Sequence, residues 1–328
     1  MLSASASDSA GAYCNRMVFE VQGQVERVKE SWLTVARRHD IFRTSFMATD
    51  DREHPFAQVV LADFPDSVPG LKALEDVVFS RLNALEPPWA LQVKTSHEGS
   101  RLEFACHHAL YDGAAMAAFM NEVEATCLGK ALPSVISNEA FLEHVVAAQS
   151  TESVQFWSER LEHFEPKLFS TSISASDFRI FSDALEVPMS AINATSQQMS
   201  TTLLSLTQSA WAKTLCILLD SQDVCFGNIT SGRSLPIDGL ERLVAPCFNT
   251  VPVRINTDHL RTNTDLAKTL HEYNASSLPF SLTSLRRVQA SVQSGGRRLF
   301  DTLFLLQQSA YQLDPSIWIL KEDAGEMD

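Results

Sequence analysis

The sequence contains no long hydrophobic run. None of its uninterrupted apolar stretches approaches the roughly 18 residues that a membrane-spanning helix needs. Residues 1–12 are rich in Ser, Ala and Asp, and they have neither the basic lead nor the apolar stretch of a secretory signal. We therefore expect a cytoplasmic protein without a membrane partner.

Positive charge is also scarce. The 26 lysines and arginines stand against 40 aspartates and glutamates, which gives a formal net charge of −14. Basic residues gather only in short pairs, such as Arg37-Arg38 and Arg286-Arg287. Binding to a phosphate backbone requires a concentrated basic surface, so this balance argues against a nucleic-acid partner.

Metal-ligand and nucleotide-binding patterns are missing as well. The six cysteines show no CxxC or other metal-like spacing. They are Cys14, Cys106, Cys127, Cys216, Cys225 and Cys247. Several of them lie within apolar runs, so we expect reduced thiols in the core. GxGxxG and P-loop patterns are absent too, so the sequence shows no nucleotide-binding signature and predicts no metal site.

The composition that is present belongs to a globular protein, with 45% hydrophobic and 20% charged residues in 328 positions. This length accommodates one large or two ordinary domains. Apolar residues alternate between strand and helix spacing along the chain, which predicts an α/β (α+β) fold. The expected strands include 57–61, 90–95, 102–106, 224–229 and 299–307, and the expected helices include 25–38, 71–85, 114–127, 141–148, 153–163 and 265–273.

A change in composition divides the chain. Residues 166–177 are rich in Ser, Thr, Pro and Lys, which is typical of a linker. They separate an N-terminal lobe, 1–165, from a C-terminal lobe, 178–328. We expect the second lobe to open with a strand near 184–187, followed by a helix over 203–218.

The most informative segment is His107-His108-Ala109-Leu110-Tyr111-Asp112-Gly113, between the expected strand 102–106 and helix 114–127. Two imidazoles, an acid and a glycine thus stand at a strand-to-helix junction, where a rigid scaffold can present side chains to a cleft. Adjacent histidines without further clustered ligands do not indicate a metal site.

This HHxxxDG pattern resembles the core motif of condensation domains from nonribosomal peptide synthetases. Further blocks are similar to the same family and occur in its order, the last of them resembling fungal siderophore synthetases in particular. They are 38–46 (RHxxLRTxF-like, with Phe42 in place of Leu), 226–233 (FGxxxSGR-like), 246–254 (GPxxNTxPVR-like, with Ala245 in place of Gly), and 282–288 with 299–304.

The resemblance implies two chloramphenicol-acetyltransferase-like lobes in a V-shaped pseudo-dimer. Because the family's domains are longer than this chain, we expect the second lobe to be incomplete, as in a fragment or a truncated product. The implied activity is acyl transfer, which forms an amide or ester between an acyl or peptidyl thioester on one carrier protein and an amine or hydroxyl acceptor on another. Nonribosomal peptide biosynthesis, with siderophore assembly as the finer expectation, is the implied setting.

The resemblance also implies the partners. Both substrates would arrive on phosphopantetheine arms of peptidyl or acyl carrier domains, next to adenylation domains of the same synthetase, and the chain itself would bind no cofactor. Alternatives remain open at this stage. They are a truncated, non-catalytic carrier-binding module, an epimerisation domain and a stand-alone CoA-dependent acyltransferase.

His108 and Gly113 are the predicted catalytic residues. At neutral pH the imidazole of His108 could accept the amine proton or hold the amine by a hydrogen bond, and the motif leaves both roles open. The N–H group of Gly113 opens a helix, where it could stabilise an oxyanion. Side chains alternate in an extended backbone, so we expect His107 to point elsewhere and to be structural.

By the family resemblance, Asp112 pairs with Arg43 and holds the loop, although a triad-like role beside His108 is an alternative. Tyr111 is expected to pack. From the block 246–254, Asn249 and Arg254 are candidates for the cleft, and a turn-forming role fits Asn249 equally well.

Overall fold

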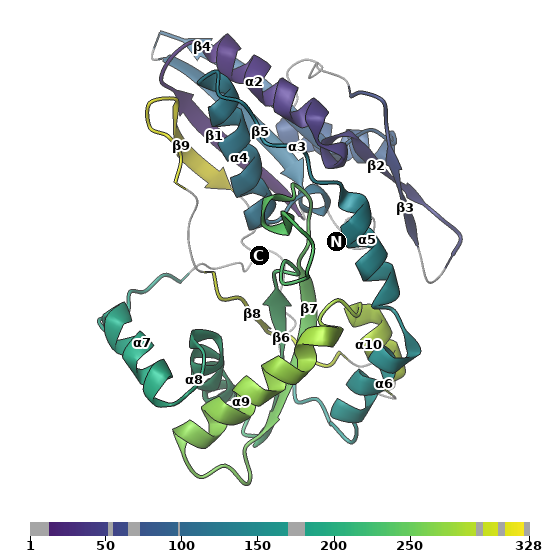
Figure 1. The fold of residues 1–328 in the computed structure, drawn as a ribbon, viewed down its shortest axis with the longest axis vertical. Coiled ribbons are helices and arrows are strands. Elements are labelled where there is room, and N and C mark those ends of the chain that lie inside the picture. Colours follow the sequence, from purple (N-terminus) through teal and green to yellow (C-terminus); the bar gives the residue numbers. More distant parts are fainter. Residues whose placement is uncertain are drawn as a thin grey trace. The chain divides into compact units, whose positions relative to one another are not determined.

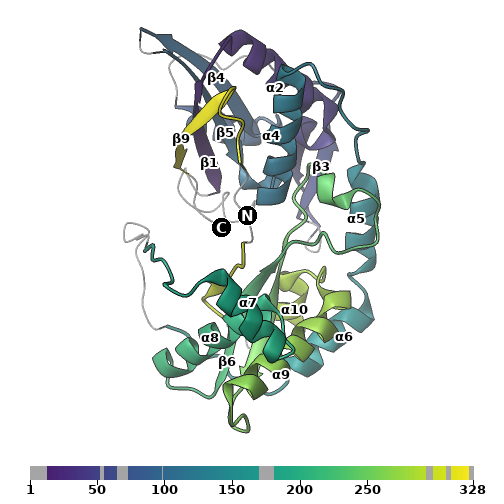
Figure 2. The ribbon, with the colours of Figure 1, turned by 60° about the vertical axis from the view of Figure 1, so that its left-hand side comes forward.

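The computed structural model describes residues 13–51, 55–64, 73–97, 99–169, 181–292, 298–307 and 312–324. The chain forms two compact units. The first comprises Met1–Leu142, Arg233–Cys247 and Ser309–Asp328, and the second comprises Glu143–Gly232 and Phe248–Gln308. Helices and strands alternate in both units, which confirms the predicted α/β class (Figures 1 and 2).

The first unit contains a four-stranded antiparallel sheet in the order β4-β5-β1-β9. Its strands are β1 (Cys14–Val21), β4 (Trp89–Ser96), β5 (Gly99–His107) and β9 (Trp318–Ala324). The register places Cys14 opposite His107, so the start of β1 lies beside the end of β5. The last residue of β5, His107, is thereby held within the sheet and is the first residue of the HHxxxDG motif.

Helices cover both faces of this sheet. Helices α2 (Val25–Arg38) and α4 (Gly113–Cys127) lie side by side on one face (Figures 1 and 2). Helix α3 (Leu74–Asn83) packs on the other face against β4, β5 and β1. Successive side chains of a strand point to opposite faces, and for this reason Phe104 contacts Trp32 of α2 while Ala105 packs in a cluster with residues of α3.

An aromatic cluster fills the face under α2 and α4. Trp32 of α2 is fully buried and its ring lies 4.7 Å from Phe104 and 5.0 Å from Phe119, centroid to centroid. Rings at this spacing add roughly 0.5–1.5 kcal/mol per pair beyond the burial of their area. The cluster therefore fixes α4, whose first residue, Gly113, is the last residue of the HHxxxDG motif.

A hairpin completes the early part of the first unit. The short helix η1 (Asp40–Arg43) leads into β2 (Thr44–Ala48), which pairs with β3 (Phe56–Val60). Helix α5 (Asn138–Ala147) follows α4 along the chain.

The second unit contains a three-stranded sheet in the order β7-β6-β8. Strand β6 (Asp223–Thr230) pairs antiparallel with β7 (Asn249–Asn256) and parallel with β8 (Leu303–Phe304). Helices α8 (Leu203–Leu218) and α9 (Asn263–Ser277) contribute to a core with one face of this sheet. The core residues are Ala212, Leu215, Val224, Phe226, Val253, Ile255, Leu266 and Leu270.

A second apolar cluster lies in the same unit and involves α6 (Thr151–Arg160) and α10 (Leu285–Ser291). It joins Trp157 of α6 and Val288 of α10 to Cys225 of β6. Neighbouring residues of β6 thus enter different cores, as the alternation of a strand buried on both faces requires.

The strand expected near 184–187 is wrong. Residues 181–187 form no strand in the described structure, and Phe181, Leu185 and Val187 are exposed. The first regular element after them is helix α7 (Met189–Gln198), capped by Pro188. Alternation alone predicted a strand there, but no neighbouring strand supplies the backbone partners that a strand requires.

The two units divide the chain differently from the lobes expected at 1–165 and 178–328. The first unit breaks off at Leu142, and it regains two stretches from the later part of the chain. Of the expected linker, 166–177, residues 170–177 lie outside the described residues.

Candidate active site

The HHxxxDG segment forms a tight turn between β5 and α4. Strand β5 ends at His107, the 3₁₀ turn η2 (His108–Leu110) follows, and Asp112 caps α4. Two backbone hydrogen bonds fix the entry to the turn. The N–H of His107 donates to the carbonyl of Pro88 at 2.9 Å, and the N–H of His108 donates to the carbonyl of Tyr13 at 2.8 Å.

The ring of His107 is a structural part of this turn. It is fully buried, and its Nδ1 accepts a hydrogen bond of 3.0 Å from the N–H of Ala109. Burial, together with the neighbouring His108, lowers the pKa of His107 to about 4. The ring is therefore neutral at pH 7, as an acceptor nitrogen must be.

His108, the predicted catalytic residue, is 5% exposed and starts the η2 turn. Its imidazole is stacked on the phenol ring of Tyr111, with ring centroids 4.6 Å apart and planes inclined by 18°. Tyr111 packs, as predicted, and the ring on which it packs is that of His108.

Asp112 is buried and both of its carboxylate oxygens accept hydrogen bonds. Oδ1 accepts from the N–H of Ala115 at 2.7 Å, which caps α4, and from Nη2 of Arg233 at 2.8 Å. Oδ2 accepts from the N–H of Cys247 at 2.8 Å. The carboxylate thus joins the motif to Arg233–Cys247, the second of the three stretches of the first unit.

Arg233 organises the stretch that Asp112 holds. Its Nη1 donates to the carbonyls of Leu240 and Leu243, each at 2.9 Å, and its Nη2 also donates to the carbonyl of Ala245 at 3.0 Å. The Arg233 guanidinium therefore bonds to three carbonyls of its own loop and also links this loop to Asp112 of the motif. Such a buried charge-assisted pair costs several kcal/mol to break when one partner is removed.

The predicted pair between Asp112 and Arg43 is wrong. Arg43 lies at the end of η1, where Nη2 binds Asp40 at 2.5 Å and Nε donates to the carbonyl of Arg37 at 3.2 Å. Its Nη1 donates to the carbonyl of Leu61. Local partners on its own turn and after β3 take up its guanidinium, while Asp112 takes an arginine 121 residues further along the chain.

Gly113 is exposed and is the first residue of α4. The side-chain cap from Asp112 uses the N–H of Ala115 and not that of Gly113. The N-terminus of a helix carries partial positive charge, so this position suits a developing oxyanion.

Asn249 and Arg254 lie on β7 in the second unit, and both hold chain segments there. The Asn249 Nδ2 donates to the carbonyls of Ser281 at 2.7 Å and Thr283 at 2.8 Å, which favours the turn-forming interpretation. The guanidinium of Arg254 binds Asp223 through Nε at 3.0 Å and Nη2 at 2.7 Å.

Arg254 also donates through Nη1 to the carbonyls of Arg160 at 3.2 Å and Glu162 at 2.7 Å. Its guanidinium thus joins β6 to the end of α6. These contacts give Arg254 a structural role within the second unit.

The described residues also bear on metal ligands, membrane spans and the cysteines. Among the described residues, no group of three or more His, Cys, Asp or Glu side chains could hold a metal ion. No helix in that part of the chain has the length and apolar character to span a membrane. All six cysteines are free thiols and five are buried, and burial raises the pKa of Cys14 and of Cys247 to about 12.

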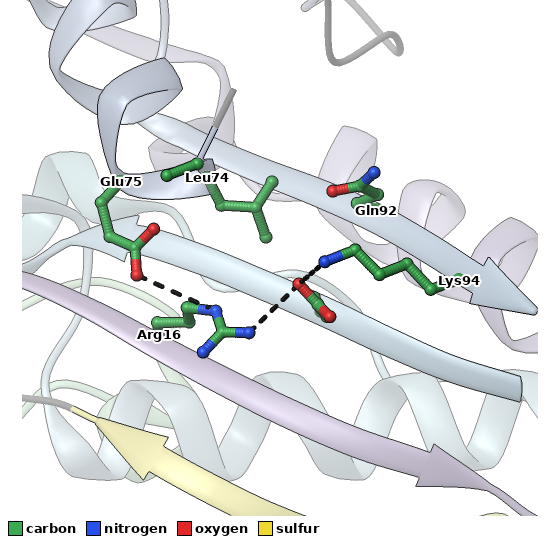
Figure 3. A pocket seen from close by; sticks show the side chains of 7 residues that line it. Arg16, Leu74, Glu75, Gln92 and Lys94 are labelled. Atoms are coloured by element: carbon green, nitrogen blue, oxygen red, sulfur yellow. Dashed lines mark hydrogen bonds and ion pairs between the residues drawn. The ribbon is translucent and has the colours of Figure 1, made fainter. Parts of the chain in front are cut away.

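A pocket of about 310 Å³ lies on the α3 face of the first unit (Figure 3), and its lining includes none of the motif residues. It is lined by Arg16, Ala73, Leu74, Glu75, Gln92, Lys94 and Glu103. Its charges pair with one another. Arg16 binds Glu103 at 3.2 Å and lies 3.8 Å from Glu75, and Lys94 binds Glu103 at 2.9 Å.

Comparison with known proteins identifies the class. Residues 81–326, more than half of the chain, match the model of the condensation domain. The chain belongs to the condensation-domain family.

Individual relatives are fungal synthetases. The chain is 39% identical over 340 residues to nonribosomal peptide synthetase 2 of Cochliobolus heterostrophus, covering all of this chain and 6% of that protein. It is 25% identical over 338 residues to the hydroxamate-type ferrichrome siderophore peptide synthetase of Schizosaccharomyces pombe, covering all of this chain and 7% of that protein. The chain therefore spans a small fraction of the curated relatives it matches.

A solved structure shares the fold. The first condensation domain of the CDA synthetase superposes with a TM-score of 0.67 at 14% identity, over 99% of this chain and 83% of that one. At this identity the likeness concerns the fold, which again agrees with the predicted α/β class.

Proposed function

We propose that this chain catalyses condensation-type acyl transfer within a fungal nonribosomal peptide synthetase. The donor is an acyl or peptidyl thioester on one carrier domain, and the acceptor is an amine or hydroxyl on another. The partners are thus carrier domains with phosphopantetheine arms and adenylation domains of the same synthetase, and the chain needs no cofactor of its own. The ferrichrome synthetase among its relatives favours a siderophore product.

The reaction balances without any additional reactant. The acceptor nitrogen or oxygen attacks the thioester carbonyl carbon, its new bond to carbon forms and the C–S bond breaks. The proton lost by the acceptor passes to the departing sulfur, which leaves as the free thiol of the donor arm. His108 carries or positions that proton, and the N–H of Gly113 stabilises the oxyanion.

One observation carries this proposal, namely the intact turn between β5 and α4. His108 begins it, Asp112 is bound by three donors, and Gly113 opens a 15-residue helix. The imidazole of His107 and the carboxylate of Asp112 are both held by hydrogen bonds, so the turn that carries His108 has a defined structure. Family membership supports the reaction class.

The test is a reconstituted condensation. A donor carrier loaded with an acyl thioester and an acceptor carrier loaded with an amino acid are mixed with the 328-residue chain, and the product is followed by mass spectrometry. We expect product from the wild type and a loss of about a hundredfold or more in His108→Ala, the usual scale of a lost proton-transfer group. His259→Ala, which changes an exposed histidine, is the matched control and should retain activity.

Other outcomes favour the alternatives. Product from an acyl-CoA and a free amine, but not from the carriers, indicates a stand-alone acyltransferase. Inversion at the α-carbon without a new bond indicates epimerisation. Carrier binding without any product indicates a non-catalytic module, and unchanged condensation by His108→Ala rules out the role assigned to His108.

A further inference from the structure

The stack of Tyr111 on His108 is a property of the turn and not a chance contact. The two residues are three apart, and η2 is a 3₁₀ turn over His108–Leu110. Tyr111 is the C-cap of η2, where the backbone is already extended (φ −149°, ψ 165°), so the one-turn helix and its extended exit together place the two rings face to face.

The turn that brings the two rings together is itself fixed at its start. Nδ1 of His107 accepts the N–H of Ala109, the residue next to His108, and thus caps η2. This neutral ring therefore sets the backbone on which His108 stands.

The far end of the stack is fixed as well. Tyr111 is 6% exposed and immediately precedes Asp112, whose carboxylate binds Ala115, Arg233 and Cys247. With its neighbour held by three donors, the phenol ring has little freedom to leave the imidazole. The plane of the His108 ring is set by a partner that cannot move away easily.

We propose that Tyr111 is a positioning residue for His108, one that fixes the plane of the imidazole through ring stacking. The proposal rests on the acyl-transfer role proposed above, in which His108 carries or directs a proton. Proton transfer requires an aligned ring nitrogen, whereas carrier binding does not. The face of Tyr111, and not its hydroxyl, is the part that acts.

Two substitutions separate the ring from the hydroxyl. Tyr111→Phe keeps the ring and removes the oxygen, while Tyr111→Leu removes the ring and keeps an apolar side chain in the buried position. We expect Tyr111→Leu to lower kcat roughly three- to tenfold, the factor that corresponds to one aromatic pair, with KM for the loaded carriers unchanged. Tyr111→Phe should retain the wild-type kcat.

A spectroscopic measurement in the folded wild type is independent of these variants. A parallel aromatic neighbour displaces the ring protons of His108 upfield in the proton NMR spectrum. Their resonance is assigned by its disappearance in His108→Gln. An ordinary, unshifted position for this resonance overturns the stack, even if Tyr111→Leu fails to fold.

The kinetic outcomes distinguish this proposal from the proposed function. If the wild type condenses and His108→Ala does not, but Tyr111→Leu keeps the wild-type kcat, the role of Tyr111 is wrong and the function stands. A loss in Tyr111→Phe equal to that in Tyr111→Leu assigns the effect to the hydroxyl and also overturns it. If the wild type forms no product, the proposed function fails, and the NMR resonance alone decides whether Tyr111 orients His108.

Discussion

At the residue scale, the two histidines of the motif have different surroundings and different tasks. His107 is fully buried and accepts a hydrogen bond from the backbone, whereas His108 stacks on a tyrosine. The alternation of side chains in an extended strand is enough to predict that the two rings point in different directions. It does not predict what each ring meets, because those partners come from the turn that follows.

The buried ring of His107 makes stability depend on pH. Its pKa is about 4 in the folded chain against 6.5 in the unfolded chain, so between these values the unfolded state binds a proton that the folded state does not. Stability is therefore lost as the pH falls from 6.5 to 4, by roughly 3 kcal/mol for this group. Urea unfolding of the wild type at pH 7 and at pH 4.5 measures the loss.

His107→Asn is the matched variant for this prediction. The Oδ1 of asparagine can accept the N–H of Ala109 from nearly the same position as Nδ1, but it does not titrate. We expect the loss of stability between pH 7 and 4.5 to be smaller in His107→Asn than in the wild type, because asparagine gains no proton on unfolding. The carboxylates titrate equally in both proteins and do not affect the difference. Equal losses in the two proteins would show that His107 does not stay neutral in the fold.

Residue-level prediction from the sequence failed at the partner of Asp112. A buried carboxylate demands a cation, and the sequence offered arginines in several blocks. Arg43 was assigned by resemblance, but Asp40 stands three residues before it on the same turn and binds it locally. Arg233 was visible in the block 226–233, yet nothing in the sequence shows that this stretch returns to the first unit.

At the scale of elements, prediction succeeded where apolar spacing was long and flanked by turns. Helices α2 and α4 and strands β4, β5 and β6 lie close to their expected bounds, because each buries a run of apolar side chains. Prediction failed for two strands near the end of the described chain. Strand β9 was not predicted, and the strand candidate 299–307 shrinks to Leu303–Phe304.

The short parallel pair of β6 and β8 depends on the close approach of two side chains, those of Phe300 and Leu303, to the backbone of β6 at Gly227. A Cβ at this position would lie 2.5 Å from Cε2 of Phe300 and 2.6 Å from Cδ2 of Leu303. We expect Gly227→Ala to destabilise the chain by about 1–3 kcal/mol, the usual cost of overpacking a core. Thermal unfolding followed by circular dichroism measures it.

The control for that substitution is Gly23→Ala, where an added Cβ meets nothing within 4 Å. It should leave the unfolding midpoint close to that of the wild type. If both variants unfold at the wild-type temperature, Phe300 and Leu303 can move aside, and the glycine is not required for β6 to pair with β8.

At the scale of the whole molecule, α4 holds together a unit assembled from three stretches of chain. At its start Asp112 binds Arg233 and the N–H of Cys247, and in its last turn Glu124 binds the stretch that ends in β9. A contiguous lobe was the natural expectation from composition. Two buried carboxylates, one at the N-cap of α4 and one in its last turn, each bind a distant part of the chain, and the pairing of β9 with β1 adds to them, so the first unit is not contiguous.

Glu124 connects α4 to the stretch that carries β9, and substitution of this residue tests the connection. Its Oε1 accepts from the backbone N–H of Asp314 and from Nε1 of the fully buried Trp318, both at 2.8 Å. Glu124→Ala leaves the buried Nε1 of Trp318 without its acceptor, at about 1–3 kcal/mol, and also frees the part-buried N–H of Asp314, while Glu124→Gln keeps an oxygen in place. Because β9 is the edge strand of its sheet, we expect this cost to appear as local opening of residues 312–324.

Hydrogen exchange read by mass spectrometry tests this opening. Amides of β9 should exchange about tenfold faster or more in Glu124→Ala, close to the wild-type rate in Glu124→Gln, and at unchanged rates in β6 of the second unit. If amide exchange becomes faster in β1, β5 and β9 together, the sheet opens as one cooperative element and β9 does not open separately. If β9 is unaffected, the ring packing of Trp318 against Phe19, 5.0 Å between centroids, is enough to hold the strand without the carboxylate.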